Sequence, residues 1–162
     1  MFKLFKKAVK QVSFSAPATG QSMPITAVSD DMFSQKIMGD GYAVKPDSDE
    51  LYAPVSGTIT SVFPTKHAIS FKTPEGLEVL LHMGVDTVEL KGAPFTLTAE
   101  EGQTVNAGDA LGTMDRAQVA AAGKSDELIV VFTNKDLISN VPVVGSAAVN
   151  HGDALGMVTL NS

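Results

Sequence analysis

Short runs of alternating apolar and polar residues, separated by clusters of Gly, Pro, Asn and Asp, fill most of this 162-residue chain. A period of two is typical of half-buried strands, and the turn residues between the runs are typical of an all-β protein. The pattern predicts strands near residues 41–46, 51–62, 67–73, 77–83, 94–98, 109–114, 127–133, 141–149 and 155–160. We therefore expect an antiparallel β-sandwich or barrel with little helix.

Two segments carry the start and stop signals of one or two short helical turns. The first begins after Asp30 or Asp31 and ends at Gly39, and the second runs from Asp115 to Gly123. In both, an acidic residue is suited to cap the first turn and a glycine is suited to end the last.

Two pairs of segments resemble each other within the chain. "VNAGDALG" at 105–112 differs from "VNHGDALG" at 149–156 in one position, and "APATG" at 16–20 is similar to "APVSG" at 53–57. The short period and the lack of further copies argue against a solenoid. We interpret them as internally related turn-strand units within one closed β-structure.

The first residues have a helical rather than a strand-like pattern. Apolar side chains recur at helical spacing (Phe2, Phe5, Val9, Val12), and lysines occupy the other side (Lys3, Lys6, Lys7, Lys10). This predicts a basic amphipathic tail over 1–13, followed by a single domain over 14–162. Two interpretations stay open for the tail, namely weak contact of residues 1–12 with an anionic membrane surface and a frayed end.

Composition and charge exclude several classes of function. The chain has no Cys, which excludes a disulfide framework and a thiolate nucleophile and is compatible with a cytoplasmic protein. The net charge is −6, and removing the +4 of residues 1–12 leaves −10 for residues 13–162. An acidic body of this kind should repel nucleic acid and suit a partner with a basic face.

Two of the three histidines lie in one stretch, "TKHAISFKTPEGLEVLLHMGVDTVEL" at 65–90. The "TPEG" segment at 73–76 suits a turn between two strands. A connection of two or four residues would place His67 directly across from His82, with about 5 Å between their Cβ atoms. A three-residue loop with a bulge would send the two imidazoles to opposite faces, so a shared site needs the even loop.

Three chemistries fit a facing pair of histidines. Zinc would need a third protein ligand, and the nearest acidic residue on the same strand face, Glu78, is about 13 Å from His82. One imidazole could act as an acid or base oriented by the other, or one could be a nucleophile that carries a covalent group. A single strand histidine is more often a half-buried structural residue, and we interpret His151, in a polar turn, as a surface residue.

Several motifs together resemble a known family. "APVSGTI", "TKHAI", "LLHMGVDTVEL", "MGDGYAVKP" and "EEGQTVNAGD" occur in order. They are similar to the glucose-family enzyme IIA component of the bacterial phosphoenolpyruvate-dependent sugar phosphotransferase system. The similarity runs from about residue 14 to residue 160, and the His-x-Gly-x-Asp-Thr motif with Thr-x-His upstream is its most specific part.

The resemblance implies a phosphocarrier that needs no cofactor. It would accept a phosphoryl group from phosphohistidine on the carrier HPr onto His82 and pass it to a Cys on the IIB domain of a glucose-type sugar permease. His67 matches the second active-site imidazole, and Thr65 and Gly84 match the partners that fix the ring tautomers. The partner-binding rim is expected at Asp30, Phe33, Phe63, Asp86 and Val88.

The resemblance also leaves alternatives. Unphosphorylated relatives in some bacteria bind and inhibit transporters or kinases, so a regulatory binding module is the second hypothesis. A zinc hydrolase is the third, and zinc at His67 and His82 is otherwise expected only where a partner supplies a bridging carboxylate. The expected location is the cytoplasm, with loose association to the inner face of the membrane through the tail.

Overall fold

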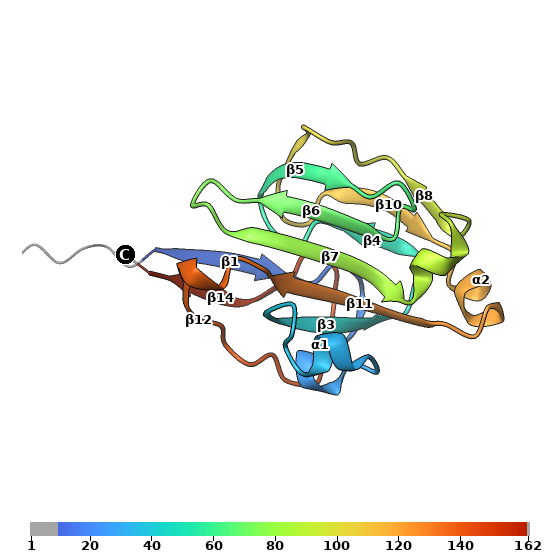
Figure 1. The fold of residues 1–162 in the computed structure, drawn as a ribbon, viewed down its shortest axis with the longest axis horizontal. Helices are drawn as coiled ribbons and strands as arrows, with labels where there is room; N and C mark the ends of the chain where they lie inside the picture. Colours follow the sequence, from blue (N-terminus) through green and yellow to red (C-terminus); the bar gives the residue numbers. More distant parts are fainter. Residues whose placement is uncertain (1–9, 162) are drawn as a thin grey trace, which may run out of the picture.

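The computed structural model describes residues 10–161, which form an antiparallel β-structure with short helical turns (Figure 1). The strands are β1 (Gln11–Ser15), β2 (Gly20–Pro24), β3 (Asp40–Pro46), β4 (Glu50–Tyr52), β5 (Gly57–Val62), β6 (Ala68–Lys72), β7 (Glu78–Val85), β8 (Phe95–Leu97), β9 (Thr104–Val105), β10 (Ala110–Met114), β11 (Ser125–Phe132), β12 (Ile138–Asn140), β13 (Ala147–Val149) and β14 (Ala154–Leu160). The helices are α1 (Asp31–Ser34) and α2 (Arg116–Ala121), with 3-10 turns η1 (Ile25–Ala27), η2 (Thr87–Leu90) and η3 (Lys135–Leu137).

The strands form one large sheet and two small ones. The large sheet has eight strands in the order β13-β2-β3-β11-β7-β6-β5-β9. The small sheets have the orders β1-β14-β12 and β4-β10-β8, and each strand pair is antiparallel. The expected all-β antiparallel sandwich is therefore confirmed.

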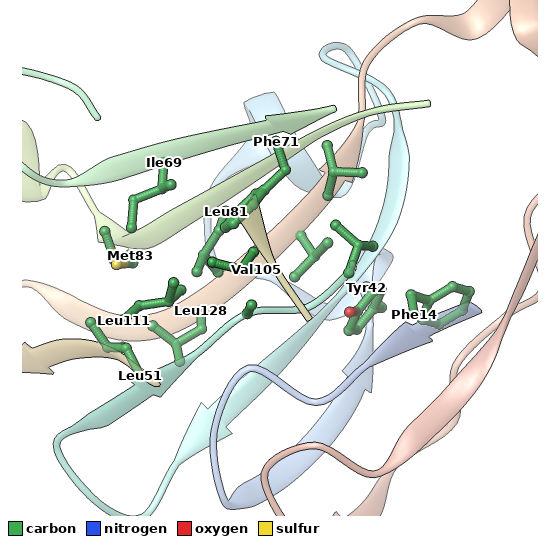
Figure 2. Close-up of a cluster of buried hydrophobic side chains, with 14 of the residues drawn as sticks. Phe14, Tyr42, Leu51, Ile69, Phe71, Leu81, Met83, Val105, Leu111 and Leu128 are labelled. Atoms are coloured by element: carbon green, nitrogen blue, oxygen red, sulfur yellow. The ribbon is translucent and has the colours of Figure 1, made fainter. Parts of the chain in front are cut away.

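The two faces of the large sheet bury different groups of side chains. One face contributes to the main core, where Phe14 stacks on Tyr42 with ring centroids 4.7 Å apart and aliphatic side chains pack together with Phe71 and Met83 (Figure 2). The Tyr42 hydroxyl donates to the carbonyl of Ser15 at 2.6 Å, and burial raises its pKa well above the ordinary value. The other face carries Leu80, Ile129 and their neighbours, and α1 with η1 covers it.

The two helices have the predicted caps and are short. Asp30 accepts a hydrogen bond from the backbone N–H of Met32 at 2.7 Å, and Asp115 accepts from that of Gln118 at 3.1 Å. Helix α1 spans four residues and α2 spans six. Among residues 10–161, no helix is long and apolar enough to cross a bilayer.

The two related turn segments adopt the same structure. In each, a glycine N–H donates to the carbonyl of an alanine on a distant segment, Gly108 to Ala53 at 2.9 Å and Gly152 to Ala16 at 3.0 Å. Both glycines have positive φ, +91° and +80°. The sequence repeat is therefore also a structural repeat.

Several predicted boundaries need correction. The predicted tail extended to residue 13, but residues 11–13 begin β1 and Val12 is buried in the core, so the domain starts earlier than residue 14. Residues 1–9 of the predicted amphipathic helix lie outside the described residues. The predicted strand over 51–62 is divided into β4 and β5, and only 147–149 of the predicted 141–149 strand are extended as β13.

Candidate active site

His67 and His82 lie side by side near one end of β6 and β7. Their ring centroids are 5.1 Å apart, and the rings are inclined at 75° in an edge-to-face arrangement. His82 projects from β7 and is half-buried, while His67 immediately precedes β6 and is 8% exposed. The structure therefore brings together the two imidazoles that the sequence analysis singled out.

The register that was predicted to bring them together is wrong. Ala68, and not His67, is paired with His82. The N–H of Thr73 donates to the carbonyl of Leu77 at 2.9 Å, which leaves a three-residue loop with Gly76 at φ +96°. This is the odd-length hairpin loop that was expected to separate the imidazoles.

The imidazoles still meet because His67 lies outside the strand. The chain makes a tight turn at the start of the hairpin, where the N–H of Lys66 donates to the carbonyl of Phe63 at 2.7 Å. Lys66 has φ +58°, a left-handed conformation that redirects the backbone. His67 is therefore not bound by the alternation of β6, and its ring lies beside that of His82.

The tautomer of His82 is fixed by the residues that follow it. Its Nδ1 is 2.7 Å from the carbonyl oxygen of Gly84. Because a carbonyl can only accept, Nδ1 carries the proton and Nε2 keeps its lone pair. Gly84 has φ +84°, and a Cβ there would lie 2.4 Å from a methyl carbon of Thr87, so this backbone position requires glycine.

His67 has a different partner for its Nδ1. The hydroxyl of Thr65 lies 2.5 Å from this atom, and either group can be the donor. The edge of the Phe63 ring packs against His67, with centroids 5.4 Å apart at 81°. Thr65 and Phe63 therefore hold the His67 ring, and its Nε2 is the nitrogen that Thr65 leaves free.

Burial favours the neutral form of both rings. Desolvation, with a smaller contribution from His82, lowers the pKa of His67 from 6.5 to about 4. Desolvation also lowers the pKa of His82, while the Gly84 carbonyl and the charges of Asp30 and Asp86 oppose this shift. Both imidazoles are therefore uncharged near neutral pH, and His82 can act as a nucleophile.

A shallow, mostly apolar pocket surrounds His82. The Phe33 ring lies 4.9 Å from the His82 ring, centroid to centroid. The pocket is lined by Asp30, Met32, Phe33, Met38, His82, Asp86 and Val88. Met32 and Val88 are 47% and 46% exposed, so apolar atoms are presented to solvent beside the histidines. The expected rim residues Asp30, Phe33, Asp86 and Val88 all line this pocket, and Phe63 lies against His67.

The sequence analysis missed three residues of this region. Met32 and Met38 line the pocket, but a methionine in a short apolar run gives no signal that separates a surface role from a core role. Thr87 is fully buried, and its hydroxyl donates to the carbonyl of Met83 at 2.6 Å. It follows Asp86 in the motif, which was the available signal for its position beside Gly84.

The donor set suits a metal ion only in part. Two imidazole nitrogens can face one ion, but a zinc site normally has at least three protein ligands. Within residues 10–161, no group of three His, Cys, Asp or Glu side chains is placed to hold a metal. A zinc ion here would therefore need a ligand from another protein.

Comparison with known proteins agrees with this geometry. Residues 12–138 match the family model described as "phosphoenolpyruvate-dependent sugar phosphotransferase system, EIIA 1". The chain is 47% identical over 143 residues to the PTS system glucose-specific EIICBA component of Streptococcus pneumoniae, covering 88% of this chain and 20% of that protein. The chain thus spans about a fifth of the length of this curated relative.

A solved structure supports the same assignment. Glucose permease IIA from Mycoplasma capricolum superimposes with a TM-score of 0.84 at 38% sequence identity, over 91% of this chain and 96% of that one. The resemblance found in the sequence is confirmed by these matches. The chain belongs to the EIIA 1 family of the phosphoenolpyruvate-dependent sugar phosphotransferase system and is a phosphocarrier component of that system.

Proposed function

We propose that His82 accepts a phosphoryl group on Nε2 from phosphohistidine HPr and passes it to a Cys on the IIB domain of a sugar permease. The observation that carries this proposal is the bond from Nδ1 of His82 to the Gly84 carbonyl, which leaves the Nε2 lone pair free beside His67. In the first step a P–N bond forms to His82 while the P–N bond of the donor histidine breaks. The donor imidazole leaves with the electron pair and takes up a proton.

His67 is proposed to stabilise the transferring phosphoryl group. Phosphoryl transfer needs little covalent help from the protein, so the site mainly aligns the groups and holds the charge spread over the phosphoryl oxygens. If Thr65 donates to Nδ1 of His67, Nε2 of His67 carries a proton that can donate to one of these oxygens. The nearby dianion would also raise the pKa of His67 and favour its cation.

The second step reverses the roles at His82. A thiolate of the IIB domain attacks phosphorus, a P–S bond forms, and the bond to Nε2 of His82 breaks. The electron pair returns to the imidazole, where a cationic His67 would compensate the developing charge. The same site therefore serves as acceptor and donor, as a carrier requires.

The surface around the histidines suits transient docking of two partners. It combines exposed apolar side chains with the acidic residues Asp30 and Asp86, and the chain as a whole carries a net charge of −6. Such charges speed the encounter with a basic partner more than they strengthen the complex. The family implies HPr and a IIB domain as partners, and we propose glucose as the sugar because relatives carry that name.

Three further features of the function are proposed. Because HPr is the proposed donor, we propose a cytoplasmic location, and other transporters or kinases could dock on the same apolar face. At such an interface a partner carboxylate could complete a zinc site with His67 and His82. The measurement for zinc is metal content by mass spectrometry of the isolated chain and of its complex, with stoichiometric zinc expected only in the complex.

The direct test is site mapping of the phosphoryl group. The chain is incubated with phosphoenolpyruvate, enzyme I and HPr, and the modified residue is located by mass spectrometry under alkaline conditions that preserve phosphohistidine. Phosphate on His82 that requires HPr is the expected result. Phosphate on another residue, or none with an active HPr, would contradict the proposal.

A further inference from the structure

We propose that Glu127 is a positioning residue for the docking face, holding Asp30 and Phe33 beside His82. This inference rests on the proposed function, because these two residues are taken to contact the phosphoryl donor. Glu127 lies on β11 and touches neither histidine ring. Its effect would pass through the segment between η1 and α1.

The hydrogen bonds that the Glu127 side chain accepts come from Ser29, in this segment, and from Ser125, on β11. Its Oε1 accepts from the N–H of Ser29 at 3.2 Å and from the Ser29 hydroxyl at 2.6 Å. The hydroxyl of Ser125 donates to the same oxygen at 3.1 Å. Hydrogen bonds to a carboxylate are about twice as strong as those between neutral groups. Glu127 is 8% exposed, so water competes little for these bonds.

Ser29 is the residue immediately before the cap of α1. Asp30 follows it and caps the helix, and Phe33 places its ring 4.9 Å from that of His82. Among residues 10–161, the hydrogen bonds that join residues 25–35 to another part of the chain both end on Glu127. The remaining attachment is apolar packing of Ile25, Val28 and Phe33. Apolar packing is not directional, so the carboxylate is what fixes the position of the segment.

Glu127 also sits on a distortion that adjoins the nucleophile. Ser125 is paired with Val85 and Leu128 with Met83, so β11 has a bulge at residues 126–127. Bulges redirect side chains and occur often beside active sites. The carbonyl of Ser125 lies 2.9 Å from where a Cβ of Gly84 would be, and Gly84 orients His82. One bulge therefore supports both the loop that orients His82 and the segment that covers it.

The adjacent residue Asp126 provides a matched control. It is equally buried at 8% exposure, and it also has polar partners, since it pairs with Lys45 and with Arg116. Lys45 belongs to β3 and Arg116 to α2, and neither lines the pocket at His82. Asp126→Asn therefore removes a buried charge next to Glu127 without touching the α1 segment.

The experiment compares Glu127→Ala, Glu127→Gln, Ser29→Ala and Asp126→Asn. Three quantities are measured, namely KM and kcat for phosphorylation by phospho-HPr and the nuclear Overhauser contact between the Phe33 and His82 rings. For Glu127→Ala we expect KM to rise about fivefold with kcat within about twofold, and a weaker ring contact, because docking geometry is lost while the nucleophile is intact. Glu127→Gln keeps an acceptor and should recover most of the loss, and Ser29→Ala should show a smaller rise.

The outcomes separate the inference from the proposed function. The inference would be overturned if Ser29→Ala and the wild type had the same KM and the same ring contact. It would also be overturned if KM rose as much in Asp126→Asn as in Glu127→Ala. Ser29 is exposed, so its variant decides the matter if Glu127→Ala does not fold. Absence of phosphate on His82 in the wild type would contradict the proposed function, while the ring contact would still test the positioning role.

Discussion

The carbonyl of His67 accepts a hydrogen bond from the N–H of Met83 at 2.7 Å, so the backbone of His67 is bonded to the neighbour of His82 and not to His82 itself. The two imidazoles meet through the turn that precedes His67, although strict strand alternation would separate them. His82 therefore lies within a strand, whereas His67 lies between a turn and the start of a strand. This difference suggests unequal roles.

Replacing each histidine should have a different result. His82→Gln should accept no phosphoryl group, because a neutral His67 that accepts from Thr65 at Nδ1 carries its proton on Nε2 and has no lone pair there for attack. His67→Gln should still be phosphorylated on His82, since the amide can donate a hydrogen bond, but transfer to the IIB domain should fall by about a hundredfold or more because the leaving imidazole lacks a cationic neighbour. Rapid-quench assays with phospho-HPr and with IIB measure the two steps. If His82→Gln were phosphorylated and His67→Gln were not, the roles assigned to the two histidines would be reversed.

Gly84→Ala should destabilise the fold more than its backbone angle alone explains. A Cβ at Gly84 would lie 2.4 Å from Thr87, in addition to its φ of +84°. Gly102 has a similar φ of +88° with nothing within 4 Å, so Gly102→Ala is the matched control. We expect about 1 kcal/mol for the control and about 3 kcal/mol for Gly84→Ala, measured by urea denaturation. Equal losses of unfolding free energy in the two variants would show that Thr87 and its neighbours can move to accommodate a Cβ at Gly84 without a further cost.

The stability of the fold should decrease as the pH falls from about 6.5 to about 4. The pKa of His67 is lowered to about 4 in the folded chain, whereas in the unfolded chain it keeps its ordinary value of 6.5. Between these values the unfolded state binds more protons, so protonation favours unfolding. The contribution is fully present above pH 6.5 and is lost as the pH falls through 4. As the pH falls across this range, the urea midpoint should decrease less steeply for His67→Gln than for the wild type. Identical pH dependence in the two proteins would contradict the lowered pKa of His67.

Removing the charge of Asp86 should slow the encounter with HPr. Asp86 is exposed at the pocket and has φ +59°, which Asn tolerates, so Asp86→Asn changes charge with little change in backbone energy. At low salt the rate should fall about two- to fivefold, with a weaker dependence on ionic strength. Glu75, exposed in the loop at the far end of the β6-β7 hairpin, gives the control Glu75→Gln. If both changes slowed the encounter equally, the net charge of the chain, and not the position of Asp86, would account for the effect.

The periodic pattern was sufficient for most of the sheet and insufficient for strand ends. β7 and β11 carry long apolar runs, and both were predicted within two residues of their observed starts and ends. β1 was missed because its apolar Val12 also fits a helical spacing, and burial in the core decides between the two patterns. Local spacing cannot report such long-range packing.

The sequence predicted which site residues lie close together, but it did not predict how the backbone brings them together. The motif identified His67, His82, Thr65 and Gly84, which the structure brings together. The loop length was misjudged because "TPEG" suits both a type I turn and a three-residue loop in which Gly76 takes positive φ. The role proposed for Glu127 had no sequence signal, since its partner Ser29 lies 98 residues away.

The paired turns at Gly108 and Gly152 have a consequence for the order of folding. The carbonyl of Ala16 accepts from the N–H of Gly152, and the carbonyl of Ala53 accepts from the N–H of Gly108. The turn at Gly152 therefore bonds to a segment more than a hundred residues before it in the chain. The N–H of Ser15 also donates to the carbonyl of Pro54 at 2.8 Å, which links the two copies. Contacts of such long sequence separation form late and slowly. During synthesis, β1 therefore cannot pair with its neighbouring strand until β14 has left the ribosome.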